Sequence, residues 1–236
     1  MDRSVTRRLA LIHTVRSLVP VFSALTREVA PDVTTTDVVD EALLDEAVAA
    51  GKVPPATAER LEGHVRRALD DGADAVLVTC SSMGAVVDEL RARHDWPLLR
   101  VDEAMVDAAL AAGSRIGVVA TLGSTLRPTA ALVSRRAREL GRDDRSVEVV
   151  TRLVDGAFAS LKAGDLDAHD AAVRAALREL IPQVDAIVLA QASMARVADT
   201  LGPGEAAATP ILSSPRLGVG RAAELLDRLD AGRASS

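Results

Sequence analysis

Short apolar runs alternate with longer amphipathic segments along almost the whole chain. Continuous apolar runs of about four to eight residues are typical of strands buried on both faces, whereas longer segments with an apolar stripe predict helices. Strands are predicted at 9–13, 33–39, 74–79, 98–101, 115–120, 147–154, 185–190 and 210–212. Helices are predicted at about 19–29, 41–50, 56–70, 85–93, 102–112, 125–140, 165–180, 194–201 and 217–229. This alternation predicts an α/β fold in which helices cover parallel sheets.

The strand at 74–79 and the residues after it recur in the second half of the chain. The first copy continues into Cys80-Ser81-Ser82-Met83, and the second continues into Gln191-Ala192-Ser193-Met194. Three further pairs of segments match in the same order and at nearly the same spacing: 8–14 with 115–121, 39–40 with 154–155, and 97–99 with 210–212. This pattern predicts an internal duplication of a four-stranded α/β unit.

The duplication predicts two pseudo-symmetric lobes, each a four-stranded parallel sheet flanked by helices. We assign residues 1–102 and 209–236 to the first lobe and 103–208 to the second, and the C-terminal strand and helix can pack on either lobe. Ligands of open parallel sheets bind outside the carboxyl ends of the strands. We therefore expect both copies of the repeated segment to point into one cleft, with Cys80 and Gln191 on opposite sides of a ligand.

The composition narrows the class of protein and of ligand. Apolar residues make up 48% of the chain and charged residues 26%, as in soluble globular proteins, and the net charge of −6 gives no reason to expect nucleic acid or a membrane as partner. The single cysteine cannot form an internal disulfide, and no run reaches the length of a signal-peptide core or a membrane span, so we expect a cytoplasmic protein. Aromatic residues are few (Phe22, Phe158 and Trp96), which favours a small substrate.

Several kinds of site are absent from the sequence. There is no P-loop, no dinucleotide-binding fingerprint and no nucleophile elbow of a serine hydrolase. The histidines His64, His94 and His169 lack the spacing of metal ligands. The sequence therefore does not predict a metal site.

Three segments resemble motifs of the aspartate/glutamate racemase superfamily. Val-Thr-Cys80-Ser-Ser after a buried strand is similar to the first catalytic motif, and Gly117-Val-Val-Ala-Thr121-Leu-Gly-Ser124-Thr125 is similar to the loop that opens the second lobe. Val-Leu-Ala-Gln191-Ala occupies the place of the second motif, which is normally Cys-Thr. The resemblance covers nearly the whole chain, because all four repeated pairs belong to it.

The resemblance implies a fold, a reaction and a set of site residues. In that superfamily two lobes enclose a small carboxylate, and two cysteines remove and return the α-carbon proton on opposite faces without a metal or pyridoxal cofactor. Cys80 matches the first cysteine, whereas Gln191 departs from the pattern, because an amide cannot act as a proton-transfer base. A homodimer is the expectation for such a protein. The residues that match hydroxyl positions around the substrate are Ser81, Ser82, Thr121, Ser124 and Thr125, and less closely Thr14 and Ser17.

The chemistry of each candidate residue has two interpretations. A helix that begins near Ser82 would lower the pKa of the Cys80 thiol, although a lone cysteine is also a common small core residue. Gln191 either donates a hydrogen bond to a substrate oxygen or is what remains after the loss of the second base. Ser193 caps the following helix or binds the ligand. His13 is either an auxiliary acid or base or a structural residue at a strand end.

The predicted function is therefore a cofactor-independent enzyme of the racemase or isomerase type. It would act at the α-carbon of a small carboxylate or amino acid, with Cys80 as the thiolate acid or base. The alternatives are a one-cysteine decarboxylase or cis–trans isomerase of the same superfamily, and a non-catalytic protein that binds a carboxylate.

Overall fold

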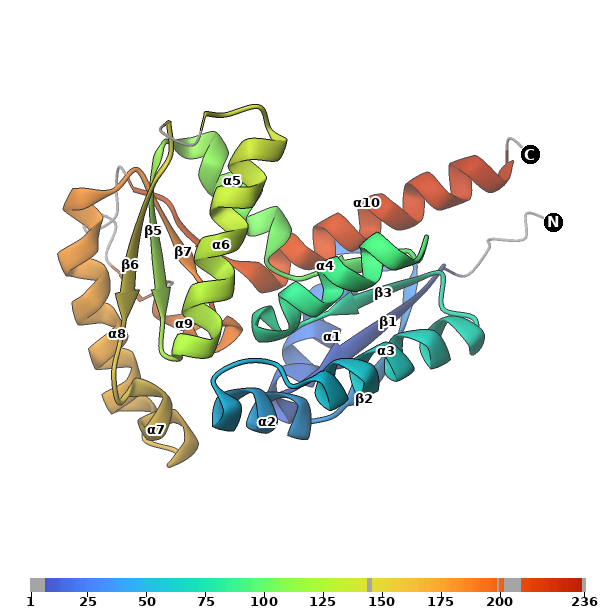
Figure 1. Cartoon of the computed structure of the whole chain (residues 1–236), viewed down its shortest axis with the longest axis horizontal. Coiled ribbons are helices and arrows are strands. Elements are labelled where there is room, and N and C mark those ends of the chain that lie inside the picture. The colour runs from blue at the N-terminus through green and yellow to red at the C-terminus, as the bar shows by residue number, and fades with distance from the viewer. Residues whose placement is uncertain (1–6, 144–145, 199, 202–208, 235–236) are drawn as a thin grey trace. The chain divides into compact units, whose positions relative to one another are not determined.

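The structure is a computed structural model that describes residues 7–143, 146–198, 200–201 and 209–234 (Figure 1). The chain divides into two compact units. The first unit comprises Met1–Val101 and Pro215–Ser236, and the second comprises Asp102–Ser214. No described helix has the length and apolar character needed to cross a membrane.

The first unit contains a parallel sheet of four strands in the order β2-β1-β3-β4 (Figure 1). The apolar run of β1 pairs with β2 on one side and with β3 on the other, so that Ile12 lies between Val38 and Val78. The strands are β1 (Arg7–His13), β2 (Val33–Val39), β3 (Ala75–Val78) and β4 (Leu98–Arg100). The α-helices of this unit are α1 (Val19–Val29), α2 (Ala42–Ala50), α3 (Pro55–Asp70), α4 (Gly84–Arg93) and α10 (Ser214–Ala234).

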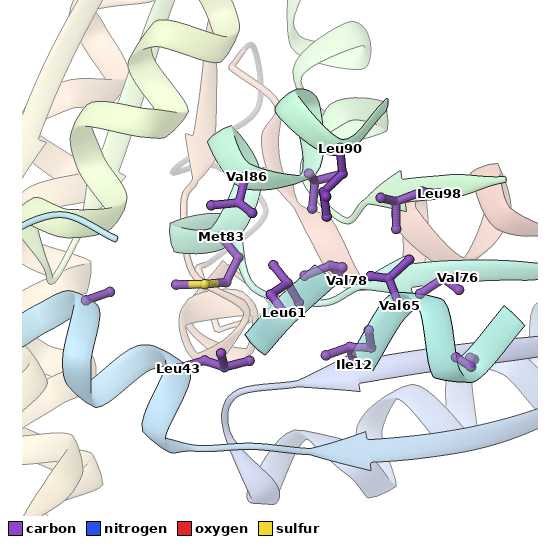
Figure 2. Close-up of a cluster of buried hydrophobic side chains, with 14 residues drawn as sticks. Ile12, Leu43, Leu61, Val65, Val76, Val78, Met83, Val86, Leu90 and Leu98 are labelled. Carbon is purple, nitrogen blue, oxygen red and sulfur yellow. The ribbon is translucent and has the colours of Figure 1, made fainter. Parts of the chain in front are cut away.

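Side chains that alternate along β1 and β3 form a core on each face of this sheet. Ala10 and Ile12 pack in one core, and Leu9 and Leu11 pack in the other with residues of α1 and α10. Figure 2 shows the first of these cores, which includes Met83, the residue that ends the repeated segment. The first core consists of Ala10, Ile12, Leu43, Ala47, Leu61, Val65, Ala68, Val76, Val78, Met83, Val86, Val87, Leu90 and Leu98.

The second unit repeats this topology, with its strands in the order β6-β5-β7-β8. The strands are β5 (Arg115–Ala120), β6 (Glu148–Leu153), β7 (Ala186–Leu189) and β8 (Ile211–Ser213), and all pair in parallel. The α-helices are α5 (Glu103–Ala112), α6 (Gly123–Glu139), α7 (Ala157–Lys162), α8 (Leu166–Leu180) and α9 (Ala195–Ala198). The predicted fold class, two four-stranded parallel sheets from a duplicated α/β unit, is confirmed.

Some elements differ from the sequence-based expectation. Strand β8 pairs with β7 and lies in the second sheet, whereas α10 belongs to the first unit apart from its first residue. The short helix α7 was not predicted; it begins after Gly156, whose φ of 77° is in the left-handed region that glycine adopts easily. The helix expected at 194–201 is described only as a 3₁₀ turn (Ala192–Met194) followed by α9, and residue 199 lies outside the described residues.

Candidate functional site

Cys80 lies at the carboxyl end of β3, where the strand turns into a helix. Its backbone is extended (φ −117°, ψ 114°), and a 3₁₀ turn at Ser81–Met83 leads directly into α4. The Met83 amide donates a hydrogen bond of 3.1 Å to the Cys80 carbonyl, and the Met83 side chain is fully buried in the core. The buried methionine therefore anchors the turn that positions the thiol.

The surroundings of Cys80 combine burial with several hydrogen-bond donors. Burial raises the pKa of the Cys80 thiol, while hydrogen bonds from the Thr14 side chain, the Ser82 and Met83 amides and the Ser82 side chain act in the opposite direction. Burial is the larger effect, so the predicted lowering of this pKa is wrong: loss of water destabilises the thiolate more than these donors stabilise it. Burial therefore favours the thiol form of Cys80 over its thiolate.

His13 belongs to a hydrogen-bonded chain that joins β1, β2 and the residue that follows β3. Its Nε2 lies 2.9 Å from Oδ1 of Asp37 on β2, and its Nδ1 lies 3.0 Å from Oγ1 of Thr79, next to Cys80. The imidazole is fully buried, and burial lowers its pKa although Asp37 acts in the opposite direction. In the neutral ring with its proton on Nε2, Nε2 donates to the carboxylate, and Nδ1 can only accept from the Thr79 hydroxyl, whose single proton is shared with the Ile12 carbonyl 3.0 Å away. With both nitrogens engaged, the structural interpretation of His13 is favoured over an auxiliary acid or base.

This arrangement predicts that stability depends on His13 and on pH. Because the folded-state pKa is lowered, the unfolded chain binds a proton that the folded chain does not, so the free energy of unfolding falls as pH drops below about 6.5. His13→Gln loses buried hydrogen bonds, costs about 1–3 kcal/mol at pH 8, and flattens this dependence. Urea unfolding from pH 8 to about pH 5 measures both effects. Parallel pH profiles for the variant and the wild type would contradict this role.

Gln191 occupies in the second unit the position that Cys80 occupies in the first. Its backbone is also extended (φ −133°, ψ 135°), it is followed by a 3₁₀ turn, and the Met194 amide donates a hydrogen bond of 3.1 Å to its carbonyl. Oε1 of Gln191 accepts hydrogen bonds from the backbone amide of Thr121 (2.6 Å) and from its hydroxyl (2.9 Å). Thr14 with Cys80 and Thr121 with Gln191 are thus equivalent pairs.

The remaining predicted site residues lie in different environments. Ser81 and Thr125 are buried, whereas Ser17 is exposed on the 3₁₀ turn Arg16–Leu18. Ser124 lies in the first turn of α6, and its Oγ is buried without a hydrogen-bond partner among the described residues. The Ser193 carbonyl accepts a hydrogen bond of 3.0 Å from Arg196. The structure thus brings Thr14, Ser82 and Cys80 into contact in the first unit and Thr121 and Gln191 in the second.

Sequence reasoning missed three side chains that support the Cys80 turn. Besides Asp37 and Thr79, Arg100 at the end of β4 is almost fully buried and forms an ion pair with Asp88 of α4. The Arg100 guanidinium lies against Gly84, where a Cβ atom would overlap it. The only signals were the charged residues Asp37 and Arg100 within predicted strands and Gly84 directly after the turn, and none of these is specific.

Comparisons with known proteins agree with this architecture. The profile of the Asp/Glu/Hydantoin racemase family matches residues 12–222. A glutamate racemase from Pseudomonas entomophila (strain L48) is 34% identical over 145 residues, which are 59% of this chain and 49% of that protein, so the match spans about half of the relative.

The described residues include no group of three or more His, Cys, Asp or Glu side chains that could hold a metal ion.

Solved structures with little sequence identity share the fold. Allantoin racemase from Klebsiella pneumoniae superposes with a TM-score of 0.63 at 20% identity, covering 95% of this chain and 88% of that one. A double mutant of arylmalonate decarboxylase in its liganded form superposes with a TM-score of 0.60 at 20% identity, and the match covers 94% of this chain and 93% of that one. The family profile, which matches residues 12–222, shows that the chain belongs to the Asp/Glu/hydantoin racemase family, as the motifs predicted, and the solved structures share its fold.

Proposed function

We propose that this protein catalyses proton transfer at the α-carbon of a small carboxylate, with the Cys80 thiol as acid and its thiolate as base. The observation that carries the proposal is the hydrogen bonding of Cys80 to Thr14, Ser82 and Met83 at the end of β3. Donors that contact the sulfur can stabilise its thiolate when a reaction forms it, and donors nearby can hold a substrate carboxylate. Membership of a racemase family supports the same chemistry.

In the proposed step the Cys80 thiol first gives its proton to solvent. The thiolate then removes the α-proton, and the electron pair of the C–H bond moves into an enolate of the carboxylate. The thiol hydrogen exchanges with solvent, and its return to the same carbon reverses the step, regenerates the thiolate and leaves a solvent hydrogen, or deuterium in D₂O, at the α-carbon. Backbone amides and hydroxyls stabilise the enolate, whose charge is concentrated on oxygen. In the first unit, Thr14, Ser81 and Ser82 are the residues proposed to bind substrate oxygens. In the second unit, taken by itself, Thr121, Ser124 and Thr125 are proposed to bind carboxylate oxygens.

A one-thiol decarboxylase is the second candidate, because burial favours the thiol form of Cys80 and Gln191 stands in place of a second thiol. In that reaction the bond between the α-carbon and one carboxylate breaks, carbon dioxide leaves, and its bonding pair forms an enolate. The Cys80 thiol then donates its proton to the carbon, and the thiolate takes a proton from water. A substrate with two carboxylates on one carbon would be required.

Exchange in heavy water tests the proposal. The wild-type protein is incubated in D₂O with single enantiomers of amino acids and 2-substituted carboxylates, and with 2-substituted malonates, and the products are followed by NMR. We expect deuterium at the α-carbon of at least one compound, loss of that activity after alkylation of Cys80, and slower alkylation in the presence of the same compound. Tight carboxylate binding without exchange or turnover would instead establish a non-catalytic binding protein.

A further inference from the structure

We propose that Gln191 is an oriented hydrogen-bond donor to a substrate carboxylate or enolate oxygen, positioned by Thr121, and takes no part in proton transfer. This inference rests on the proposed function and assigns a role to the residue that departs from the family pattern. Gln191 has the backbone conformation and following turn of Cys80, so its side chain starts from the equivalent point of the second unit.

Thr121 fixes which end of the Gln191 amide is free. A backbone N–H can only donate, so the atom 2.6 Å from the Thr121 amide must be the carbonyl oxygen of Gln191. The Thr121 hydroxyl, 2.9 Å from the same atom, supplies a second donor. An amide oxygen has two lone pairs, and both are therefore occupied. The orientation of the side chain follows from the contacts and does not depend on telling nitrogen from oxygen.

The other end of the amide presents two N–H donors. The side chain is half-buried, and no group among the described residues accepts a hydrogen bond from Nε2. An amide nitrogen cannot act as a base near neutral pH, and the oxygen that is the weakly basic atom is already engaged. Two outward N–H donors bind an oxygen anion, such as a carboxylate or an enolate, more strongly than a neutral oxygen, because hydrogen bonds to a charged acceptor are stronger.

The residues around this position also favour an anion. Thr121 is followed by α6, a helix of 17 residues that begins at Gly123 and has no acidic residue in its first turn. Its positive end is available to negative charge, and the Ser124 Oγ in that turn is buried without a partner among the described residues. These features support an oxygen anion as the group that Gln191 recognises.

The substitution Gln191→Glu tests the donor directly. Glutamate keeps the chain length and an oxygen for Thr121, but replaces the NH₂ group with a second oxygen that repels a carboxylate. We expect KM for the exchanging substrate to rise by about 10- to 100-fold, as for loss of a hydrogen bond to a charged group. Gln183→Glu is the matched control: it makes the same chemical change on an exposed residue and should leave KM unchanged.

Further variants separate binding from chemistry. Calorimetric titration of the carboxylate into Cys80→Ser and into Cys80→Ser/Gln191→Glu should show the same loss of affinity without turnover. Thr121→Val, which removes one of the two donors that hold Oε1, should raise KM less than Gln191→Glu, and Thr121→Ser should restore it. An unchanged KM and affinity in Gln191→Glu would overturn the inference. Turnover at the wild-type rate in Cys80→Ser would instead overturn the proposed function, whatever Gln191 does.

Discussion

Replacing Cys80 with serine will lower the rate of α-carbon exchange by about 10²- to 10⁴-fold, the contribution usually made by a positioned acid or base. The substitution changes sulfur to oxygen in nearly the same space, so the hydrogen bonds from Thr14, Ser82 and Met83 can form again. The hydroxyl is a far weaker acid than the thiol, so an alkoxide is not accessible near neutral pH. The loss should therefore be in kcat, with substrate binding retained.

Three measurements keep this result interpretable. The melting temperature of Cys80→Ser should stay close to that of the wild type, and a carboxylate that exchanges with the wild type should still bind in calorimetry. Iodoacetamide should inactivate the wild type and leave the residual rate of the variant unchanged, because Cys80 is the only cysteine. A folded Cys80→Ser protein with a wild-type exchange rate would show that another group transfers the proton.

The largest expected effect on stability is that of Gly84→Ala. The added methyl group would overlap the buried Arg100 guanidinium, which is held by Asp88 and lies against the first residue of α4. Overpacking of this kind costs about 1–3 kcal/mol, and displacement of a buried ion pair raises the cost further. Because Gly84 directly follows the Ser81–Met83 turn, we also expect a lower exchange rate.

Gly63→Ala is the matched control for this substitution. Gly63 lies inside α3 and is exposed, and a Cβ atom added there would meet no neighbouring side chain within 4 Å. Alanine is the better helix former, so this change should raise the free energy of unfolding by about 0.5–1 kcal/mol. Denaturant unfolding of both variants measures the difference. Equal effects of the two substitutions would contradict the close packing of Arg100 on Gly84.

Most of the fold could be predicted because it follows from local pattern. The buried runs of β1, β3, β5 and β7 have the length of strands, and the two copies of the repeat imply the same strand order in each sheet. Element ends were predicted less well. Helix α7 is too short for a clear periodicity, and its boundaries depend on Gly156 and Gly164, which both have positive φ.

The candidate site could be predicted only in part, because its energetics depend on contacts between distant segments. The repeat identified Cys80 and Gln191 as equivalent positions, and both stand at strand ends followed by the same turn. The direction of the Cys80 pKa shift was missed, because burial depends on packing that no local pattern reports. The contacts of His13 with Asp37 and Thr79 were missed for the same reason: they join β1, β2 and the residue after β3, which are separate in sequence.

The stereochemical course of exchange tests the central claim most directly, namely that Cys80 transfers the proton alone while Gln191 only donates hydrogen bonds. One enantiomer of an exchanging substrate is incubated with the wild-type protein in D₂O, and deuterium content and enantiomeric excess are measured together. We predict that deuterium enters the α-carbon while the enantiomeric excess stays constant. Loss of enantiomeric excess in step with deuterium incorporation would require a second proton-transfer group and would contradict this claim.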